Sequence, residues 1–475
     1  MSAEKKSTLV FIPFPILSHQ AAAIHMANLM VDRDERLSVT IILMKIPIDP
    51  KIDSHSNNNT NNNNPRINFV ELPQDYSKFA EWSKSPKSFV VNFMESQKGL
   101  VKDAVANIIK GSKSSCKLAG FVVDMFCTPM IEVADEIGVP SYIFFTCSAS
   151  VLGLFFHLQR LSDEQNWDLS EEENSDATVS IPAYINPVPA KVWPNIVFEK
   201  ESGFLKFMKK FREAKGIIVN TFLEFEPHAI KSLSDDDKIP PVYPVGPIIQ
   251  TENDNQDPNN EIIEWLNEQP DSSVVFICFG TTGSFDIDQV NEIAVALENS
   301  EHRFLWSLRK PPPKDKLEFP MEFENLGDVM PDGFLERTVG IGKVIGWAPQ
   351  MAVLSHPAVG GFVSHCGWNS ILESVWCNVP IAVWPIYAEQ QANAFQLVKE
   401  FGIGVEIKMD YRKDRDVIVP AEKIEKAIRE LMGSENEGRV KVKVLNEKSR
   451  VVMAKGGSSY DFLGRFIDSV MDNAS

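Results

Sequence analysis

The sequence predicts an α/β fold of two domains, each a parallel β-sheet flanked by helices. Short apolar runs rich in β-branched and aromatic residues alternate with helical patterns, which is typical of βαβ units. The alternation begins near residue 9 and begins again near residue 274. Residues 250–260 (QTENDNQDPNN) are polar and lie between the two halves. We therefore expect an interdomain linker there and a cleft between the domains.

The first half contains four expected strands, at residues 9–13, 39–44, 119–123 and 142–145. After the first strand, apolar residues recur at i, i+3, i+4 and i+7, the spacing of one helix face: Ala23, Met26, Ala27 and Met30. A similar stripe over residues 130–137 ends at Gly138, which we expect to be the C-terminal cap of that helix.

The second half repeats the pattern. A strand is expected at 274–279, followed by a glycine-containing turn at 280–284 and a helix whose apolar face includes Val290 and Leu297. The expected first domain covers residues 1–249, and the second covers residues 261–455.

Two other polar stretches are expected to be surface loops. Residues 55–64 are rich in asparagine and low in complexity, which is typical of a disordered loop. Residues 412–415 lie among charged residues, and we expect them to be solvated.

The formal net charge is −18 for 475 residues. Nucleic acids and anionic membrane surfaces attract proteins through a positive field, so neither is an expected partner. An anionic ligand would have to be held locally, by main-chain N–H groups or by helix ends.

The chain is expected to be cytoplasmic. Its six cysteines lie scattered without a Cys-x-x-Cys pair, which is typical of reduced thiols. The first residues lead into a strand-like run without the apolar core of a signal peptide. The only candidate for a membrane segment, 142–156, is short and contains three hydroxyl side chains, so membrane insertion is not expected.

The segment 347–390 combines a strand, a tight turn and a helix. Residues 360–364 have a strand pattern, and residues 365–368 (HCGW) are expected to form the turn. Asn369 and Ser370 are expected to cap a helix from Ile371 to about Trp376.

Asn378 is expected to end this helix in the left-handed conformation, before a strand at 381–384. The start of the helix offers unpaired N–H groups together with His, Asn and Ser side chains. Such a helix end binds phosphate or pyrophosphate without Lys or Arg, because the helix dipole is positive there.

The same segment, WAPQMAVLSHPAVGGFVSHCGWNSILESVWCNVPIAVWPIYAEQ, resembles the 44-residue signature box of the plant family 1 UDP-glycosyltransferases. More than a dozen fixed positions match, from Trp347 to Gln390. The similarity extends over nearly the whole chain, through FIPFP near the start, VVDMFC at 122–127, INPVPAKVWP at 185–194, YPVGPI at 243–248 and WLNEQP at 265–270. It is greatest with the branch that acts on flavonoids, other phenolics and terpenoids.

The resemblance implies the GT-B architecture of two facing Rossmann-like domains. The first domain would hold an apolar acceptor, and the second would hold the UDP-sugar. Residues 456–475 would pack back on the first domain, as in the family.

The resemblance also implies how the nucleotide is bound. Trp347 would stack on uracil, with Ala348 and Gln350 at the edge of the base, and Glu373 would accept hydrogen bonds from the ribose. The diphosphate would be held by residues from two segments: His365, Asn369, Ser370, Thr281 and Ser284.

Three residues would read the sugar hydroxyls: Trp368, Glu389 and Gln390. In the family a closing Gln usually accompanies glucose and a closing His galactose, so Gln390 favours UDP-glucose. Tryptophan is more often a core residue, and glutamate is more often solvated. Their joint spacing within one box favours the binding roles.

Transfer of a sugar to a hydroxyl needs a base, and a neutral His is suited to that task near pH 7. His19 follows the first strand, and Asp124 follows the strand at 119–123. Ligands gather at the carboxyl ends of parallel strands. A lone His there is more often structural, but both residues occupy the places of the family's catalytic dyad. His25 is about 120° further around the helix, so it is not expected to share the site.

The chain departs from the family just before His19. The family typically has glycines there, whereas this chain has Ile16 and Ser18, which lack the tolerance of glycine for positive φ. His25 stands where a Glu is common. These differences bear on the shape of the acceptor pocket and on the rate.

No metal cofactor is expected. Asp286 and Asp288 match the Asp-x-Asp spacing of metal-dependent glycosyltransferases, but they open a helix and fit an N-terminal cap better. The chain contains no P-loop and no full GxGxxG, which disfavours nucleotide kinases and NAD enzymes.

Together these patterns predict an inverting glycosyltransferase that moves glucose from UDP-glucose to a hydroxyl of a small apolar acceptor. His19 would be the general base, Asp124 its partner, and the protein a monomer. Two alternatives stay open: another sugar-nucleotide enzyme on the same scaffold, and a UDP-sugar-binding protein without catalysis. The acceptor, the position modified and transfer to O, N, S or C are not determined.

Overall fold

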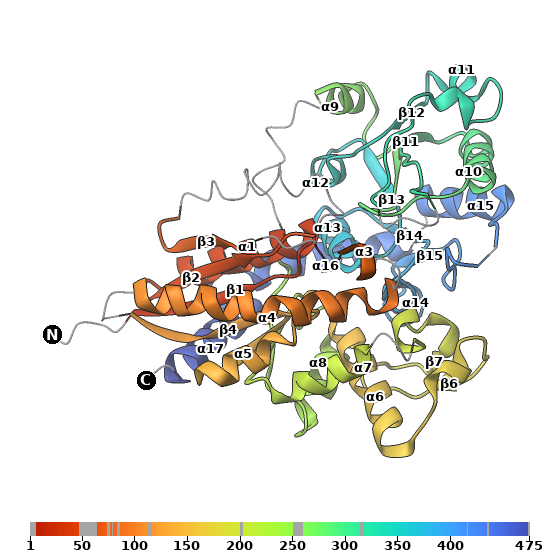
Figure 1. Cartoon of the computed structure of the whole chain (residues 1–475). Coiled ribbons are helices and arrows are strands. Elements are labelled where there is room, and N and C mark those ends of the chain that lie inside the picture. The colour runs from red at the N-terminus through yellow and green to blue at the C-terminus, as the bar shows by residue number, and fades with distance from the viewer. Residues whose placement is uncertain are drawn as a thin grey trace.

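The computed structural model contains two α/β units, one above the other in Figure 1. It describes residues 6–46, 64–73, 77, 79–82, 86–111, 116–199, 203–249, 260–313, 318–415, 417–434 and 437–473. Apart from Asn64 and Asn260, the expected loop at 55–64 and the expected linker at 250–260 lie outside the described residues.

The first sheet has seven parallel strands in the order β3-β2-β1-β4-β5-β8-β9. These are β1 (Lys6–Ile12), β2 (Leu37–Leu43), β3 (Ile67–Glu71), β4 (Cys116–Asp124), β5 (Ser141–Phe145), β8 (Ile217–Val219) and β9 (Val242–Pro244). From β1 the chain moves outward to β2 and β3, then returns to β4 on the other side. In open α/β sheets, ligands bind at the carboxyl ends of strands beside such a reversal.

The second sheet has six parallel strands in the order β12-β11-β10-β13-β14-β15, with its reversal between β10 and β13. These are β10 (Val274–Cys278), β11 (Arg303–Ser307), β12 (Gly342–Ile345), β13 (Val359–Ser364), β14 (Ile381–Val383) and β15 (Gly404–Glu406). The prediction of two domains, each with a parallel sheet, is confirmed.

Helices cover both sheets (Figure 1). Those of the first unit are α1 (Leu17–Arg33), α3 (Phe79–Trp82), α4 (Pro86–Gly111), α5 (Met130–Ile137), α6 (Ala149–Gln165), α7 (Phe204–Lys210) and α8 (Pro227–Asp235). The second has α9 (Asn260–Asn267), α10 (Ile287–Ser300), α11 (Phe334–Thr338), α12 (Gln350–Leu354), α13 (Trp368–Trp376), α14 (Gln390–Phe395), α15 (Ala421–Met432) and α16 (Glu437–Val452). The chain continues into α17 (Ser458–Asn473).

The helix ends follow the sequence in part. Gly138 caps α5 with φ of 82°, and Asn378 has the expected positive φ of 59°. The expected start of α13 was wrong: the helix begins at Trp368, with Gly367 at the N-cap and no side-chain capping bond. Gly367 has no side chain that could cap the first turn of α13. The main-chain N–H groups of that turn are therefore left for a ligand.

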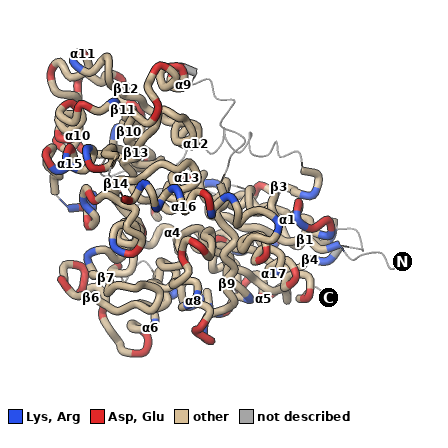
Figure 2. The backbone as a smooth tube through the Cα atoms, turned by 180° about the vertical axis from the view of Figure 1, so that it is seen from behind, with Lys and Arg blue, Asp and Glu red and all other residues tan. Residues whose placement is uncertain are grey.

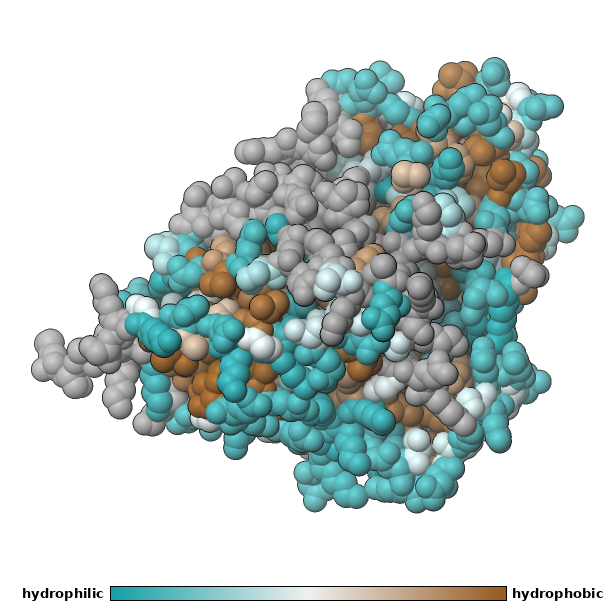
Figure 3. All heavy atoms as spheres, in the orientation of Figure 1, coloured by the Kyte–Doolittle hydropathy of each residue, from teal (hydrophilic) through white to brown (hydrophobic). Residues whose placement is uncertain are grey.

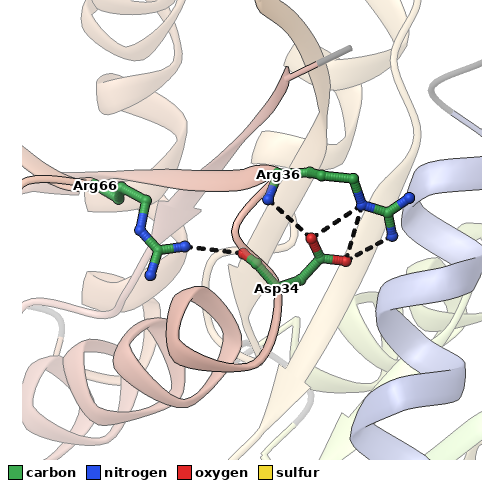
Figure 4. Close-up of polar contacts among 3 residues, drawn as sticks. All are labelled: Asp34, Arg36 and Arg66. Carbon is green, nitrogen blue, oxygen red and sulfur yellow. Dashed lines mark hydrogen bonds and ion pairs between the residues drawn. The ribbon is translucent and has the colours of Figure 1, made fainter. Parts of the chain in front are cut away.

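The turn between α1 and β2 is held by Asp34 (Figure 4). Its carboxylate accepts hydrogen bonds from the main-chain N–H of Arg36 over 2.8 Å and from the Arg36 guanidinium. Its main-chain carbonyl accepts one from Arg66 over 2.9 Å. The hydrogen bond from Arg36 is the largest cause that lowers the pKa of Asp34. This contact fixes the connection between the C-terminal end of α1 and β2.

Helix α17 packs on the first unit although it follows the second in sequence (Figure 1). The Phe466 ring makes edge contacts with Tyr142 and Tyr243, at centroid distances of 5.1 and 5.4 Å. Asn473 also donates a hydrogen bond to the hydroxyl of Tyr142 over 3.1 Å. The helix therefore completes the core on one side of the first sheet.

Acidic and basic residues are mixed along both units (Figure 2). The face seen in Figure 3 is mostly hydrophilic, with separate apolar patches. No helix in the described part of the chain is long and apolar enough to cross a membrane.

Candidate active site

His19 and Asp124 lie together at the reversal point of the first sheet. His19 is in the first turn of α1, and Asp124 is the last residue of β4. Nδ1 of His19 is 2.6 Å from Oδ2 of Asp124, and Oδ1 of Asp124 accepts a hydrogen bond from the N–H of Phe126 over 3.0 Å. Asp124 is only 2% exposed. The held carboxylate makes Nδ1 the donor, which leaves Nε2 as the ring nitrogen that can accept a proton.

Aromatic rings line the imidazole of His19. The centroids of the Phe14 and Phe126 rings lie 5.9 and 5.7 Å from it. Burial by itself lowers the pKa of His19, but the carboxylates of Asp124 and Glu389 more than compensate, so the net pKa is raised. The imidazolium form is therefore stabilised in place.

The missing glycines before His19 cause no backbone strain. Ile16 is extended, with φ of −127°, and its N–H donates to the carbonyl of Phe14 over 2.8 Å. Ser18 lies within α1. Since neither position has a positive φ, neither requires glycine.

His365 occupies the matching place in the second sheet, directly after β13 and opposite the turn that follows β10. A Cβ atom on Gly280 or on Gly367 would lie 2.6 Å from Nε2 of His365, so both glycines permit close packing on the ring. Burial lowers the pKa of His365 to about 4. Its Nδ1 is buried without a hydrogen-bond partner among the described residues. The ring is neutral at pH 7 and can still bind a polar ligand.

Gln350 connects two of the expected nucleotide-binding residues. Its Nε2 donates to Oγ of Ser370 over 2.8 Å and to Oε2 of Glu373 over 2.6 Å. Both partners lie on α13, one turn apart. These three side chains form one polar patch.

Trp347 lies half-buried before α12. Its main-chain N–H donates to Oε1 of Glu322 over 3.1 Å, and its ring lies 5.8 Å from the guanidinium of Arg309. The neighbouring Ala348 is buried. Sequence reasoning missed Arg309 and Glu322, because they lie outside the signature segment.

Trp368, the first residue of α13, contacts the first unit. Its indole N–H donates to the main-chain carbonyl of Asn220 over 2.6 Å, and its ring stacks on Phe225 at 5.5 Å. Asn369 accepts a hydrogen bond from the Asn220 amide over 3.2 Å. The Trp368 side chain is thus committed to the contact between the two units. The expectation that Trp368 reads a sugar hydroxyl stays a prediction, and it concerns the main chain of Trp368, because the indole N–H already has a buried acceptor.

Glu389 and Gln390 lie at the start of α14. Oε1 of Gln390 accepts hydrogen bonds from the N–H groups of Ile386 and Tyr387, over 2.9 and 3.1 Å. Burial raises the pKa of Glu389, and His19 opposes this effect from the other unit. The expected base and the expected sugar-reading carboxylate are therefore close enough to interact electrostatically.

The turn after β10 brings Thr281 and Ser284 to the same edge. Thr281 is half-buried, and Ser284 accepts a hydrogen bond from Nζ of Lys413 over 2.7 Å. The neighbouring Thr282 is hydrogen-bonded to the hydroxyl of Tyr387. Sequence reasoning missed Lys413, which lies in a stretch expected to be solvated.

Lys413 and Asp414 are exposed, as expected for this stretch, but the expectation was wrong for Arg412, which is only 2% exposed. Its Nη2 donates to the carbonyls of Lys191 and Trp193 in the first unit, over 3.1 and 2.6 Å. The guanidinium of Arg412 also lies over the ring of Phe198 in the first unit. Arg412 therefore joins the two units, because these carbonyls and this ring compensate its buried positive charge.

The Asp286–Asp288 pair lies at the start of α10. Asp286 is at the N-cap without a side-chain capping bond, and Asp288 is in the first turn. In the described part of the chain, no three His, Cys, Asp or Glu side chains are grouped to hold a metal ion.

Comparisons with known proteins show which family the chain belongs to. Residues 51–436 match the model of the family "UDP-glucoronosyl and UDP-glucosyl transferase". The chain is 54% identical to UDP-glycosyltransferase 71E1 of Stevia rebaudiana, over 98% of each protein. It is 51% identical to UDP-glucose flavonoid 3-O-glucosyltransferase 6 of Fragaria ananassa, over 98% of this chain and 99% of that protein.

Solved structures of similar transferases have the same fold as this chain. A transferase from Siraitia grosvenorii in complex with UDP has a TM-score of 0.86 and 46% identity, over 98% of this chain and 100% of that one. A Medicago truncatula enzyme complexed with UDP-glucose also has a TM-score of 0.86, with 41% identity over 98% of each chain. The chain therefore belongs to the plant family 1 UDP-glycosyltransferases and is a glycosyltransferase enzyme with the GT-B fold.

Proposed function

We propose that this enzyme transfers glucose from UDP-glucose to a hydroxyl of a small apolar acceptor, with inversion, to give a β-glucoside. The observation that carries the proposal is the pair of His19 and the buried Asp124, 2.6 Å apart, in which His19 interacts electrostatically with Glu389 of the other domain. A direct transfer requires the base to face the bound donor, and this interaction places the base of one domain near a proposed donor-binding residue of the other.

In this mechanism Nε2 of His19 takes the proton of the acceptor hydroxyl as its oxygen attacks the anomeric carbon. The bond from that carbon to the diphosphate breaks, and UDP leaves with the electron pair. Asp124 stabilises the imidazolium and holds its orientation. A single displacement of this kind converts an α-linked donor into a β-linked product.

We propose that the donor lies along the second domain. Trp347, Ala348 and Gln350 would hold uracil, and Glu373 would hold the ribose. The diphosphate would be bound by the side chains around the start of α13 and the β10 turn: His365, Asn369, Ser370, Thr281 and Ser284. The orphan Nδ1 of His365 supports this arrangement, because a buried polar atom needs a partner.

The sugar would lie between Glu389, Gln390 and the main chain at Trp368. The names of relatives support glucose: the Fragaria protein is a UDP-glucose transferase, and the Medicago structure contains UDP-glucose.

An apolar acceptor is supported by the rings beside the base. Phe14 and Phe126 flank His19, and Phe204 lies 6.3 Å from Phe126. A Fragaria relative is a flavonoid 3-O-glucosyltransferase, and one from Manihot esculenta is an anthocyanidin 3-O-glucosyltransferase. We therefore propose a flavonoid, another phenolic or a terpenoid as acceptor.

We also propose that the enzyme needs no metal and works as a cytoplasmic monomer. The helix end at α13 can carry the diphosphate charge without a cation. The five cysteines whose side chains the structure describes are free, which fits a reducing compartment. Both halves of the proposed site come from one chain, so a second subunit is not needed to complete it.

The test is incubation with UDP-glucose and a panel of flavonoids, simple phenols and terpenols, with and without EDTA. Mass spectrometry should show a hexose adduct, and proton NMR should show the β-anomer. An α-linked product would contradict inversion. Tight UDP-glucose binding without product across the panel would favour a binding protein, and loss of activity in EDTA that magnesium restores would contradict metal independence.

A further inference from the structure

Asn393 is a buried residue of α14 whose side chain reaches three separate segments. It lies one helical turn after Glu389 and is 0% exposed. A buried primary amide has two N–H donors and a carbonyl acceptor, all of which need partners. The partners of Asn393 lie in the turn at residues 365–368, called here the His365 loop, in Glu389 and in the first domain.

The donors of Asn393 lie on the side of the second domain. Nδ2 donates to the main-chain carbonyl of Cys366 over 3.0 Å and contacts Oε1 of Glu389 at 3.4 Å. Cys366 has a positive φ of 64° and follows His365 directly. A non-glycine residue in this conformation needs support from its surroundings. The amide of Asn393 supplies part of that support.

The acceptor of Asn393 lies on the side of the first domain. Its Oδ1 accepts a hydrogen bond from the hydroxyl of Ser148 over 3.4 Å. Ser148 caps α6, and its oxygen accepts from the N–H of Val151 over 3.1 Å. The capping bond uses an oxygen lone pair, so the hydroxyl hydrogen is available to Asn393.

We propose that Asn393 is a positioning residue that holds Glu389 and the His365 loop in register with the domain that carries His19. The inference rests on the proposed function, which assigns Glu389 to the sugar and His19 to proton transfer. It adds a residue that would touch neither substrate. Asn393 acts through Glu389, Cys366 and Ser148.

Several groups surround the carboxylate of Glu389. They are His19 from α1, Cys147 from the loop after β5, and Tyr387 and Asn393 from its own domain. His19 also faces Asp124. A new charge at position 393 would act on His19 mainly through Glu389.

The test is Asn393→Asp. This change keeps the volume and the acceptor for Ser148, but it removes both donors and adds a negative charge beside Glu389. We expect KM for UDP-glucose to rise about tenfold and kcat to fall about tenfold. UDP affinity by calorimetry should fall about threefold, less than the change in KM for UDP-glucose, because UDP contacts the His365 loop through its diphosphate but lacks the sugar. The acid limb of kcat/KM should move upward by about half a pH unit, since added negative charge favours protonated His19.

Gln391→Glu is the matched control. Gln391 lies on the same helix, is 0% exposed, and donates to the carbonyl of Tyr411 over 2.7 Å. Gln391→Glu also replaces a buried amide with an acid, so the melting temperature of this variant should fall by about as much as that of Asn393→Asp. Its acid limb and its KM for UDP-glucose should stay at the wild-type values.

Asn393→Ser removes the amide without adding charge. It should raise KM for UDP-glucose several-fold without moving the acid limb, and it serves if Asn393→Asp does not fold. A wild-type KM in Asn393→Ser, or equal acid-limb shifts in Asn393→Asp and Gln391→Glu, would overturn the proposal. Wild-type protein that binds no UDP would instead refute the proposed function.

Discussion

The indole N–H of Trp368 donates to the main-chain carbonyl of Asn220 over 2.6 Å, which joins the start of α13 to the residue that follows β8. Both residues are buried, with Trp368 at 2% and Asn220 at 0% exposure. The bond fixes the helix end of one domain against the sheet of the other.

Trp368→Phe should retain much of the stacking on Phe225 but leave the Asn220 carbonyl without its donor. Because an unsatisfied buried acceptor is costly, we expect the free energy of unfolding to fall by about 1–3 kcal/mol. Urea unfolding followed by circular dichroism measures it. Trp376→Phe is the control, since that ring is stacked by Arg450 outside this contact. Equal losses in both variants would argue against a specific role for the Asn220 bond.

His19→Ala should lower kcat by about 10²–10⁴-fold, the usual contribution of positioned proton transfer. Donor binding should barely change, because the proposed donor-binding residues lie on the other domain. Asp124→Ala should do less damage, and the double variant should be little worse than His19→Ala, because the two residues act as one unit. Single-turnover kinetics with an aliphatic alcohol and an acidic phenol checks this. Near-normal turnover of the alcohol by His19→Ala would refute the mechanism.

The pH profile should report the raised pKa of His19. A general base must be neutral, so kcat/KM should fall as pH falls through a pKa above the ordinary 6.5. Glu389→Gln removes one of the carboxylates that raise this pKa, so its acid limb should move to lower pH. Rates measured from roughly pH 5 to pH 9 are sufficient. A limb that moves upward in Glu389→Gln would contradict the coupling.

Trp347→Ala should raise KM for UDP-glucose at least about tenfold, because stacking on a base contributes about 1–3 kcal/mol. Calorimetry with UDP alone should show the same loss, since the base and not the sugar is affected. Trp384→Phe is a control in the core of the same domain. An unchanged UDP affinity in Trp347→Ala would remove this residue from the site.

Gln390→His should weaken the preference for glucose. Oε1 of Gln390 accepts two main-chain hydrogen bonds from Ile386 and Tyr387, and an imidazole cannot replace both. The loop before α14 should therefore shift. Initial rates with UDP-glucose and UDP-galactose give the ratio, and an unchanged ratio would show that residue 390 does not select the sugar.

Local sequence patterns predicted much of the secondary structure and some of the helix ends. The alternating strands and helices, the cap at Gly138 and the left-handed Asn378 each depend on a few neighbouring residues. Arg412 was assigned wrongly because its partners, the carbonyls of Lys191 and Trp193, are more than two hundred residues away. The bond from Trp368 to Asn220 is concealed in the same way, because 148 residues separate the two. Sequence periodicity carries no information about such pairs, so the contacts between the domains had to come from the structure.

The packing of α17 on the first sheet has a consequence for biosynthesis. Tyr142 and Tyr243 lie against Phe466, so part of that sheet stays uncovered while the ribosome translates the whole second domain. Domains generally fold as units during synthesis, the N-terminal one first. The first domain can therefore complete its core only after residues 458–473 have left the ribosome, and one apolar face of its sheet stays uncovered until then.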